Sequence, residues 1–190
     1  MHPERLGGLC LLMAIAACER RPASTVLEPA HVVSPAGVSF IEACTPTGPE
    51  ICANATDDNC NGLIDEGCGV GTGKLQFEVA WGDSPAVIEL IVVDPRGDRV
   101  DSAHRSTPSG LKLDRICPQD GCHGMNVDNV SFVGERPISG QYTVTVKLTD
   151  TTSASLPVKA RFGWRIGTRG ATTEILLYGV DDTKVFSFEL

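Results

Sequence analysis

Apolar and polar side chains alternate along three stretches in the second half of the chain. Every second residue is apolar in residues 75–81 (LQFEVAW), 141–148 (QYTVTVKL) and 158–166 (VKARFGWRI). Successive side chains of a strand point to opposite faces, so this period of two predicts antiparallel strands that are buried on one face only. In this interpretation polar residues such as Gln76 and Glu78 fall on the open face.

Other segments predict further strands and the turns between them. Residues 86–93 (AVIELIVV) are apolar on both faces except at Glu89, which is typical of a central strand. Residues 174–179 (EILLYG) and 184–190 (KVFSFEL) predict two closing strands, separated by a turn at 180–182. The sequence DPRGD that follows Val93 is a turn signal as well.

These segments predict a fold class for residues 74–190. Six or more short strands, with no stretch of helical period, favour an all-β domain and within that class an immunoglobulin-like antiparallel β-sandwich. The runs FEVAWGDSPAVIELIVVDPRGD and NVDNVSFVGERPISGQYTVTVKL resemble uncharacterised bacterial domains of the YfaP kind, over Leu75 to Leu148. The chain has apolar Val87 and Ile88 where those relatives carry acidic pairs, so the resemblance does not imply a cation site on this domain.

The N-terminus has the pattern of an export signal. Arg5 precedes an apolar run at residues 6–17, which is too short for the ~20 residues of a membrane span and ends in small residues. The sequence AIAAC resembles the lipobox of bacterial lipoproteins, which implies cleavage after residue 17 and a lipid on Cys18. The alternative is an ordinary signal with an incidental cysteine. We expect a lipid-anchored protein of the cell envelope, on the outer membrane or facing the periplasm, with residues 18–43 as a flexible linker.

Export and charge limit the chemistry of the remaining chain. Six cysteines remain after the signal and the lipidated cysteine, and an even number in an exported protein predicts disulfides: Cys44, Cys52, Cys60, Cys68, Cys117 and Cys122. The net charge of −8 argues against nucleic acid as a partner and is compatible with binding cations.

Residues 44–73 form an acidic, cysteine-rich module with too few apolar side chains for a core of its own. Cys44, Cys52, Cys60 and Cys68 are each eight positions apart, and the segment carries five acids and no base. Four cysteines allow three pairings. The order Asp57, Asn59, Asn61, then Gly62, matches the start of an EF-hand-type calcium loop. The predicted ligands are the side chains of this loop and the groups that follow it: Asp57, Asn59, Asn61, the Leu63 carbonyl, Asp65 and Glu66.

The whole run CTPTGPEICANATDDNCNGLIDEGC resembles the MopE-type metal-binding motif of bacterial surface proteins. The match is closest at the cysteines, Glu50, DDNCNG and DEGC, and it departs at residues 53–55. That family is associated with copper. Oxygen donors without His or Met favour calcium instead, and paired cysteines would offer no thiolate to copper. Three interpretations of the module remain open: it binds calcium, it binds another metal such as copper, or it is a disulfide-linked spacer that binds nothing.

No residue pattern predicts an enzyme. Cys117 and Cys122 favour a local disulfide rather than a metal pair. His104 and His123 have no evident nucleophile and orienting partner. We expect a binding or structural protein whose sandwich meets an envelope protein or a polysaccharide. The alternative is an envelope enzyme with its site in the long loop at residues 104–123.

Overall fold

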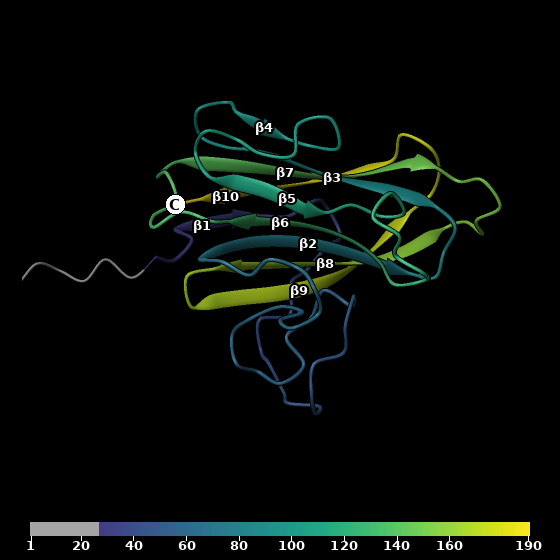
Figure 1. Cartoon of the computed structure of the whole chain (residues 1–190), viewed down its shortest axis with the longest axis horizontal. Coiled ribbons are helices and arrows are strands. Elements are labelled where there is room, and N and C mark those ends of the chain that lie inside the picture. The colour runs from purple at the N-terminus through teal and green to yellow at the C-terminus, as the bar shows by residue number, and fades with distance from the viewer. Residues whose placement is uncertain (1–26) are drawn as a thin grey trace, which may run out of the picture.

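A computed structural model describes residues 27–190 of the chain. The predicted signal and the lipidation residue Cys18 lie outside the described residues. The described part is all-β and consists of two five-stranded antiparallel sheets, with the acidic module attached to one of them (Figure 1). The predicted all-β class is therefore confirmed.

The strands are divided equally between two sheets. Sheet A has the order β1-β10-β7-β3-β4, with bounds β1 His31–Val33, β10 Thr183–Glu189, β7 Gln141–Asp150, β3 Val87–Val93 and β4 Arg99–Val100. Sheet B has the order β5-β6-β2-β8-β9, with bounds β5 Leu111–Arg115, β6 Asn126–Phe132, β2 Leu75–Gly82, β8 Val158–Ile166 and β9 Arg169–Leu177.

The core lies between the sheets, where the predicted apolar faces meet. On β7 the apolar residues of the alternation are buried and the residues between them are exposed or half-buried, as predicted. Phe77 of sheet B packs against Phe188 of sheet A, and Phe162 stacks on Phe186. The long alternating strands therefore provide the inner faces of a two-layered, sandwich-like body.

Some strands differ from the expectation. The apolar strand β3 is second from the edge of sheet A. Its outer neighbour β4 has two residues and covers it only at Val92 and Val93. β5 lies inside the segment 104–123, which the sequence predicts as one long loop. Its short run LKLDR offers only two apolar residues, Leu111 and Leu113, which is too weak a signal to stand out.

The described part of the predicted linker, residues 27–43, is packed rather than free. β1 pairs with β10, and Ile41 forms an isolated bridge with Thr172 of β9. Phe40 lies among core aromatic rings, with its centroid 5.8 Å from that of Trp164 and 5.6 Å from that of Phe186. The flexible-linker prediction is wrong for this stretch, because one aromatic side chain and one short strand order it despite its low periodicity.

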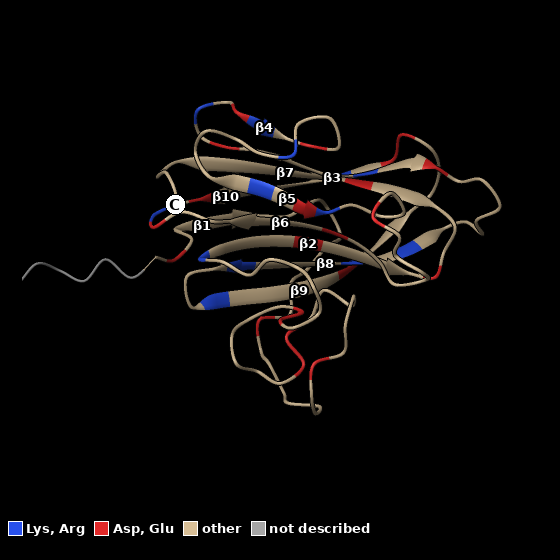
Figure 2. Cartoon of the chain, viewed as in Figure 1, with Lys and Arg blue, Asp and Glu red and all other residues tan. Residues whose placement is uncertain are grey.

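β2 is buried on both faces, contrary to the half-buried strand predicted from its period. Gln76 and Glu78 are both 0% exposed although their side chains point away from the core. The reason is the acidic module, which covers this outer face of sheet B. The module contains many of the acids that are coloured red below β9 in Figure 2.

Candidate metal-binding module and its contact with sheet B

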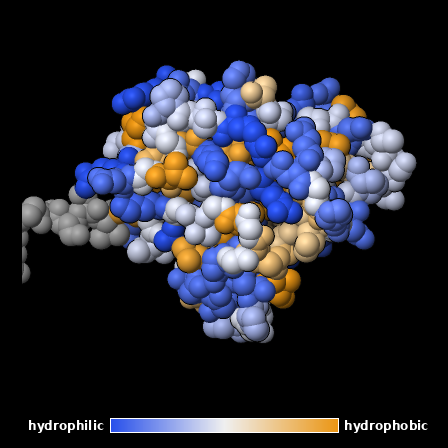
Figure 3. Space-filling view, in the orientation of Figure 1, coloured by the Kyte–Doolittle hydropathy of each residue, from blue (hydrophilic) through white to orange (hydrophobic). Residues whose placement is uncertain are grey.

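Two interleaved disulfides hold the module together. Cys44 pairs with Cys60 and Cys52 pairs with Cys68, and each bridge spans sixteen residues. A third bridge joins Cys117 and Cys122. The predicted disulfides are confirmed, and of the three possible pairings in the module the structure adopts the overlapping one. A module that exposes a mainly hydrophilic surface (Figure 3) is thereby cross-linked where it lacks apolar packing.

The predicted calcium loop is a tight turn stabilised by its own polar side chains. The Asp57 carboxylate accepts hydrogen bonds from the backbone N–H groups of Asn61 (3.1 Å) and Gly62 (2.7 Å). Asn59 Oδ1 accepts from Asn61 N at 3.0 Å, and Asn61 Oδ1 accepts from the N–H of Leu63 at 2.9 Å. Gly62 has a φ of 87°, in the left-handed region that favours glycine.

Glu66 lies against this loop. Its Oε1 atom accepts from Asn59 Nδ2 at 2.6 Å and also from Asn61 Nδ2. The structure thus brings together four of the residues predicted as ligands: Asp57, Asn59, Asn61 and Glu66. The other carboxylate oxygen, Glu66 Oε2, is buried and has no hydrogen-bond partner within residues 27–190.

Glu50 lies within electrostatic range of Glu66, although the sequence did not predict it as a ligand. Its Oε1 accepts from Asp65 N at 2.9 Å, and its Oε2 is buried without a partner in the described chain. The pKa of Glu50 is raised to about 7, mainly by burial and also by the nearby charges of Glu66 and Asp58, which together outweigh the lowering effect of its backbone hydrogen bonds. Its place in the MopE-type run was the only sequence signal that could have found it.

Asp65 points elsewhere. It has a φ of 50°, and its carboxylate is completely buried, where it accepts from the N–H groups of Asn54 and Ala55, both at 3.1 Å. This left-handed backbone separates two consecutive acids, so that Asp65 faces sheet B while Glu66 faces the loop. Asp65 is thus not seen with the other predicted ligands. Within residues 27–190, no three His, Cys, Asp or Glu side chains converge closely enough to hold a metal by themselves.

A buried polar network lies between the module and sheet B; we call it the seam, and it consists of Ile64, Asp65, Gln76, Glu78 and Asn129. Gln76 Nε2 has three acceptors around it: Ile64 O at 3.1 Å, Glu78 Oε2 at 3.2 Å and Asn129 Oδ1 at 3.0 Å. Burial raises the pKa of Glu78 well above its usual value, and the adjoining Asp65 carboxyl raises it further. The seam therefore joins side chains of β2 and β6 to the backbone of the module.

Two glycine positions allow the module and its connection to lie so close to the sheet. A Cβ on Gly163 of β8 would be 2.5 Å from the carbonyl oxygen of Ala55. A Cβ on Gly71 would clash with Asp114 and Ser131, and the Gly71 carbonyl accepts from Asn129 Nδ2 at 2.9 Å. The glycine-rich connection at residues 69–73 is thus packed against the sheet.

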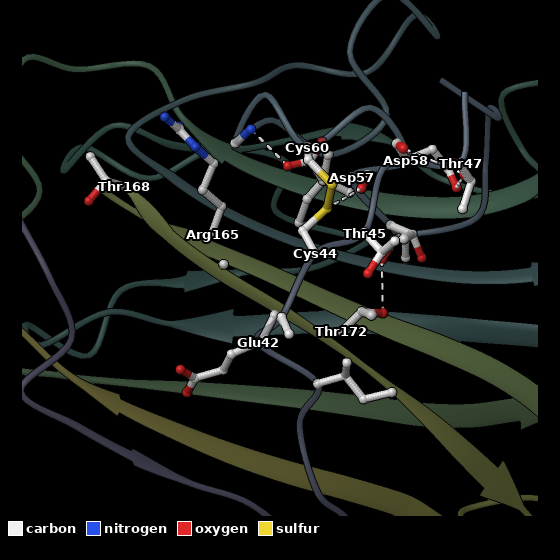
Figure 4. A pocket seen from close by; sticks show the side chains of 18 residues that line it. Glu42, Cys44, Thr45, Thr47, Asp57, Asp58, Cys60, Arg165, Thr168 and Thr172 are labelled. Atoms are coloured by element: carbon white, nitrogen blue, oxygen red, sulfur yellow. Dashed lines mark hydrogen bonds between the residues drawn. A yellow bond between two sulfur atoms is a disulfide. The ribbon is translucent and has the colours of Figure 1, made fainter. Parts of the chain in front are cut away.

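A cleft of about 400 Å³ opens between the module and the edge of sheet B (Figure 4). The Cys44–Cys60 disulfide and Arg165 are on its wall, and Thr172 Oγ1 donates to Ala55 O at 3.1 Å beneath it. Burial lowers the pKa of Arg165, whereas the charge of Asp57 acts in the opposite direction.

The segment suggested for an enzymatic site contains ordinary surface ion pairs. Arg105 contacts Asp120 at 2.6 Å, and His104 Nδ1 lies 3.1 Å from Asp101. The neighbouring Ser102 hydroxyl donates to Glu89 at 2.5 Å rather than to a histidine.

Comparison of the chain with protein-family models, with curated proteins and with solved structures finds no match. Among the described residues there is no helix with the length and apolarity that a membrane crossing needs. What the fold and the site define is a class: an all-β protein that carries a disulfide-cross-linked acidic module on the outer face of one sheet.

Proposed function

We propose that the chain is an exported, lipid-anchored binding protein whose acidic module binds calcium. The observation that carries the calcium proposal is the pair of buried carboxylate oxygens, Glu50 Oε2 and Glu66 Oε2, which have no hydrogen-bond partner in the described chain. A buried carboxylate oxygen without a donor is costly, and a cation offsets that cost. The charge of Glu66 acts on Glu50, so both acids belong to one electrostatic site.

The ligand set consists of the loop and these two acids. Glu50 and Glu66 supply the unpartnered oxygens, and Asp57 and the Leu63 carbonyl lie in the same turn. The amide groups of Asn59 and Asn61 face Glu66 through nitrogen, while their oxygens accept backbone N–H groups, so either amide presents its oxygen to an ion only by giving up that hydrogen bond. Asp65 is not part of this proposed set, because it is engaged at the seam.

The donor chemistry favours calcium over copper. Calcium takes six to eight oxygen ligands in a flexible geometry. Copper(I) prefers soft sulfur, and all six cysteines in residues 27–190 are paired in disulfides. A copper-binding protein remains the alternative, and a thiol count on the native protein separates the two.

The rest of the proposal concerns the body and its location. An immunoglobulin-like sandwich is supported by the two antiparallel sheets and by Tyr142 at the start of β7, whose hydroxyl donates to the carbonyl of Ile138 at 2.9 Å, as in a tyrosine corner. The lipobox-like sequence supports an anchor on Cys18 in the bacterial envelope, and three disulfides suit an oxidising compartment. The sandwich is then free to bind an envelope protein or a polysaccharide, without catalysis.

Calorimetric titration of the full mature chain, freed of metal and with its disulfides intact, tests the calcium site. Glu66→Gln and Glu50→Gln keep the shape of the side chain and remove its charge. We expect each to weaken calcium binding by roughly tenfold or more, because affinity follows the number of charged ligands. Glu135→Gln changes an exposed glutamate in a loop and should bind like the unchanged protein. Equal affinity in all three variants would refute the site.

A further inference from the structure

The seam contains two carboxyl groups in contact and sealed from solvent. Asp65 and Glu78 are both 0% exposed, and they lie within hydrogen-bonding reach of one another. Glu78 Oε1 has no partner in the part of the chain that the structure describes. Two buried carboxyl groups that face each other cannot both be ionised unless a cation lies between them; without a cation, one of them keeps its proton.

The seam also has more acceptors than donors. The amide nitrogen of Gln76 has two hydrogens but three oxygen neighbours, and the amide oxygen of the same residue is buried without a partner in residues 27–190. Gln76 is itself 0% exposed. The seam therefore holds two completely buried polar side chains, Gln76 and Glu78, each with an unused oxygen.

Neighbouring charges do not compensate for this excess of oxygens. Arg161 donates to Thr56 Oγ1 at 3.2 Å, and Arg165 donates to the carbonyl of Gly73. No basic side chain in residues 27–190 contacts Asp65 or Glu78. Asp114 adds a further negative charge close to Glu78.

We propose that a second calcium ion binds in this seam, held by the carboxylates of Asp65 and Glu78 and by the amide oxygen of Gln76. The amide nitrogen of Gln76 now faces Glu78 and Ile64, so a half-turn of the amide is needed to present its oxygen, and the same turn frees the carbonyl of Ile64 as a further ligand. Magnesium fits less well, because it keeps several of its waters and the seam is closed. The site is distinct from that of Glu50 and Glu66, and it joins the module to sheet B through the ion.

Counting the bound calcium tests the proposal. The full mature chain, with disulfides intact and stripped of metal by a chelator, is equilibrated with calcium chloride, and bound calcium per chain is measured by elemental analysis. We expect two ions for the unchanged protein and one for Glu78→Gln. Glu66→Gln should retain the seam ion. Glu174→Gln, the same substitution on the outer side of β9, should leave the number unchanged.

The outcomes separate this proposal from the proposed function. If the unchanged protein binds one ion, Glu66→Gln binds one and Glu78→Gln binds none, the seam site stands and the loop site fails. If Glu78→Gln binds as many ions as the unchanged protein, the seam holds a proton instead and the proposal is overturned.

A second measurement covers the case in which Glu78→Gln does not fold. Calcium is added to Glu66→Gln, in which the loop site is weakened, and hydrogen exchange is followed at the amides of Asn54 and Ala55. These amides donate to Asp65, so calcium in the seam should slow their exchange. Exchange at the same rate with and without calcium would also overturn the proposal.

Discussion

At the scale of single residues, the acids of the module divide by what their oxygens contact. Asp58 accepts from the N–H of Ile51 at 3.1 Å and from Asn54 Nδ2 at 2.8 Å, and Asp65 accepts two backbone N–H groups. These acids organise the fold of the module. Glu50 and Glu66 each leave one buried oxygen unused. Charge density alone, as seen in the sequence, does not separate acids that stabilise a turn from acids that are available to an ion.

Asp128 provides a pH-dependent test of the sandwich that is independent of any metal. It is 1% exposed on β6, and its carboxylate accepts from Cys117 N at 2.8 Å and, across the core, from Leu90 N of sheet A at 3.2 Å. Burial raises its pKa to about 7, and the two N–H groups offset only part of that effect. The folded protein therefore binds the proton of Asp128 more tightly than the unfolded chain, whose value is about 3.9.

The sign of the pH dependence follows from this difference. The contribution of Asp128 to stability is fully present below about pH 4, decreases as the pH rises to about 7 and is constant above, with a total change of up to about 4 kcal/mol. Asp128→Asn cannot ionise, so its free energy of unfolding should fall less over this interval than that of the unchanged protein. Urea unfolding at a series of pH values measures the difference. Asp83→Asn, at an exposed residue, is the control, and parallel curves for Asp128→Asn and the unchanged protein would contradict the assignment.

The sequence could predict some of these residues but not others. The disulfide cysteines and the loop from Asp57 to Asn61 stand out, because their spacing is local. Glu78 does not, because a polar residue in an alternating strand is expected to face solvent. Its burial results from the preceding module, which folds back over the outer face of β2, and the alternation within β2 does not record that contact.

At the scale of elements, the alternation of apolar and polar residues and the turn sequences predicted the long strands well. β7 and β8 have the predicted apolar faces, and DPRGD forms a turn in which Gly97 N donates to Asp94 O at 2.9 Å. The two-residue β4 and the three-residue β1 are too short to show a recognisable alternation of apolar and polar residues. The packing of Phe40 was not predicted, because it lies in a stretch of Pro, Ala, Ser and Val, where a single aromatic residue is a weak signal.

Gly163 tests whether the module is attached to its sheet by close packing. A methyl group at this position would press against the Ala55 carbonyl, at 2.5 Å, and against Ile64 Cδ1, at 3.3 Å. Gly163→Ala should therefore displace the module and lower the free energy of unfolding by about 1–3 kcal/mol, a usual cost of overpacking. Limited proteolysis with mass spectrometry should show faster cleavage within residues 44–73, while the sheets stay resistant.

A matched variant controls for the loss of a glycine. An added Cβ on Gly179 meets nothing within 4 Å, so Gly179→Ala should behave like the unchanged protein in both assays. If Gly163→Ala is cleaved no faster than Gly179→Ala, the module does not depend on this contact. Polar bonds at the seam would then be sufficient to keep it in place.

At the scale of the whole molecule, the ordered segment before β2 would limit the distance between the sheets and a membrane if Cys18 carries the proposed lipid. Pairing with β10 begins at His31, thirteen residues after the proposed anchor at Cys18. A fully extended chain covers at most about 3.6 Å per residue, so the sheets can lie no more than roughly 50 Å from the lipid. With the proposed anchor, any partner of the sandwich would have to reach this zone next to the membrane.

This reach depends on the anchor, and Cys18 provides its test. Cys18→Ser should prevent lipid attachment, so the protein should move from the membrane fraction to the soluble envelope fraction and lose incorporation of labelled palmitate. Cys10→Ser lies in the segment that the predicted cleavage removes and should leave both properties unchanged. If Cys18→Ser stays in the membrane fraction with its label, the lipid is elsewhere and the limit of roughly 50 Å, which is counted from residue 18, no longer applies. If it leaves the membrane, the sandwich and the module that we propose to bind calcium lie within that distance of the lipid.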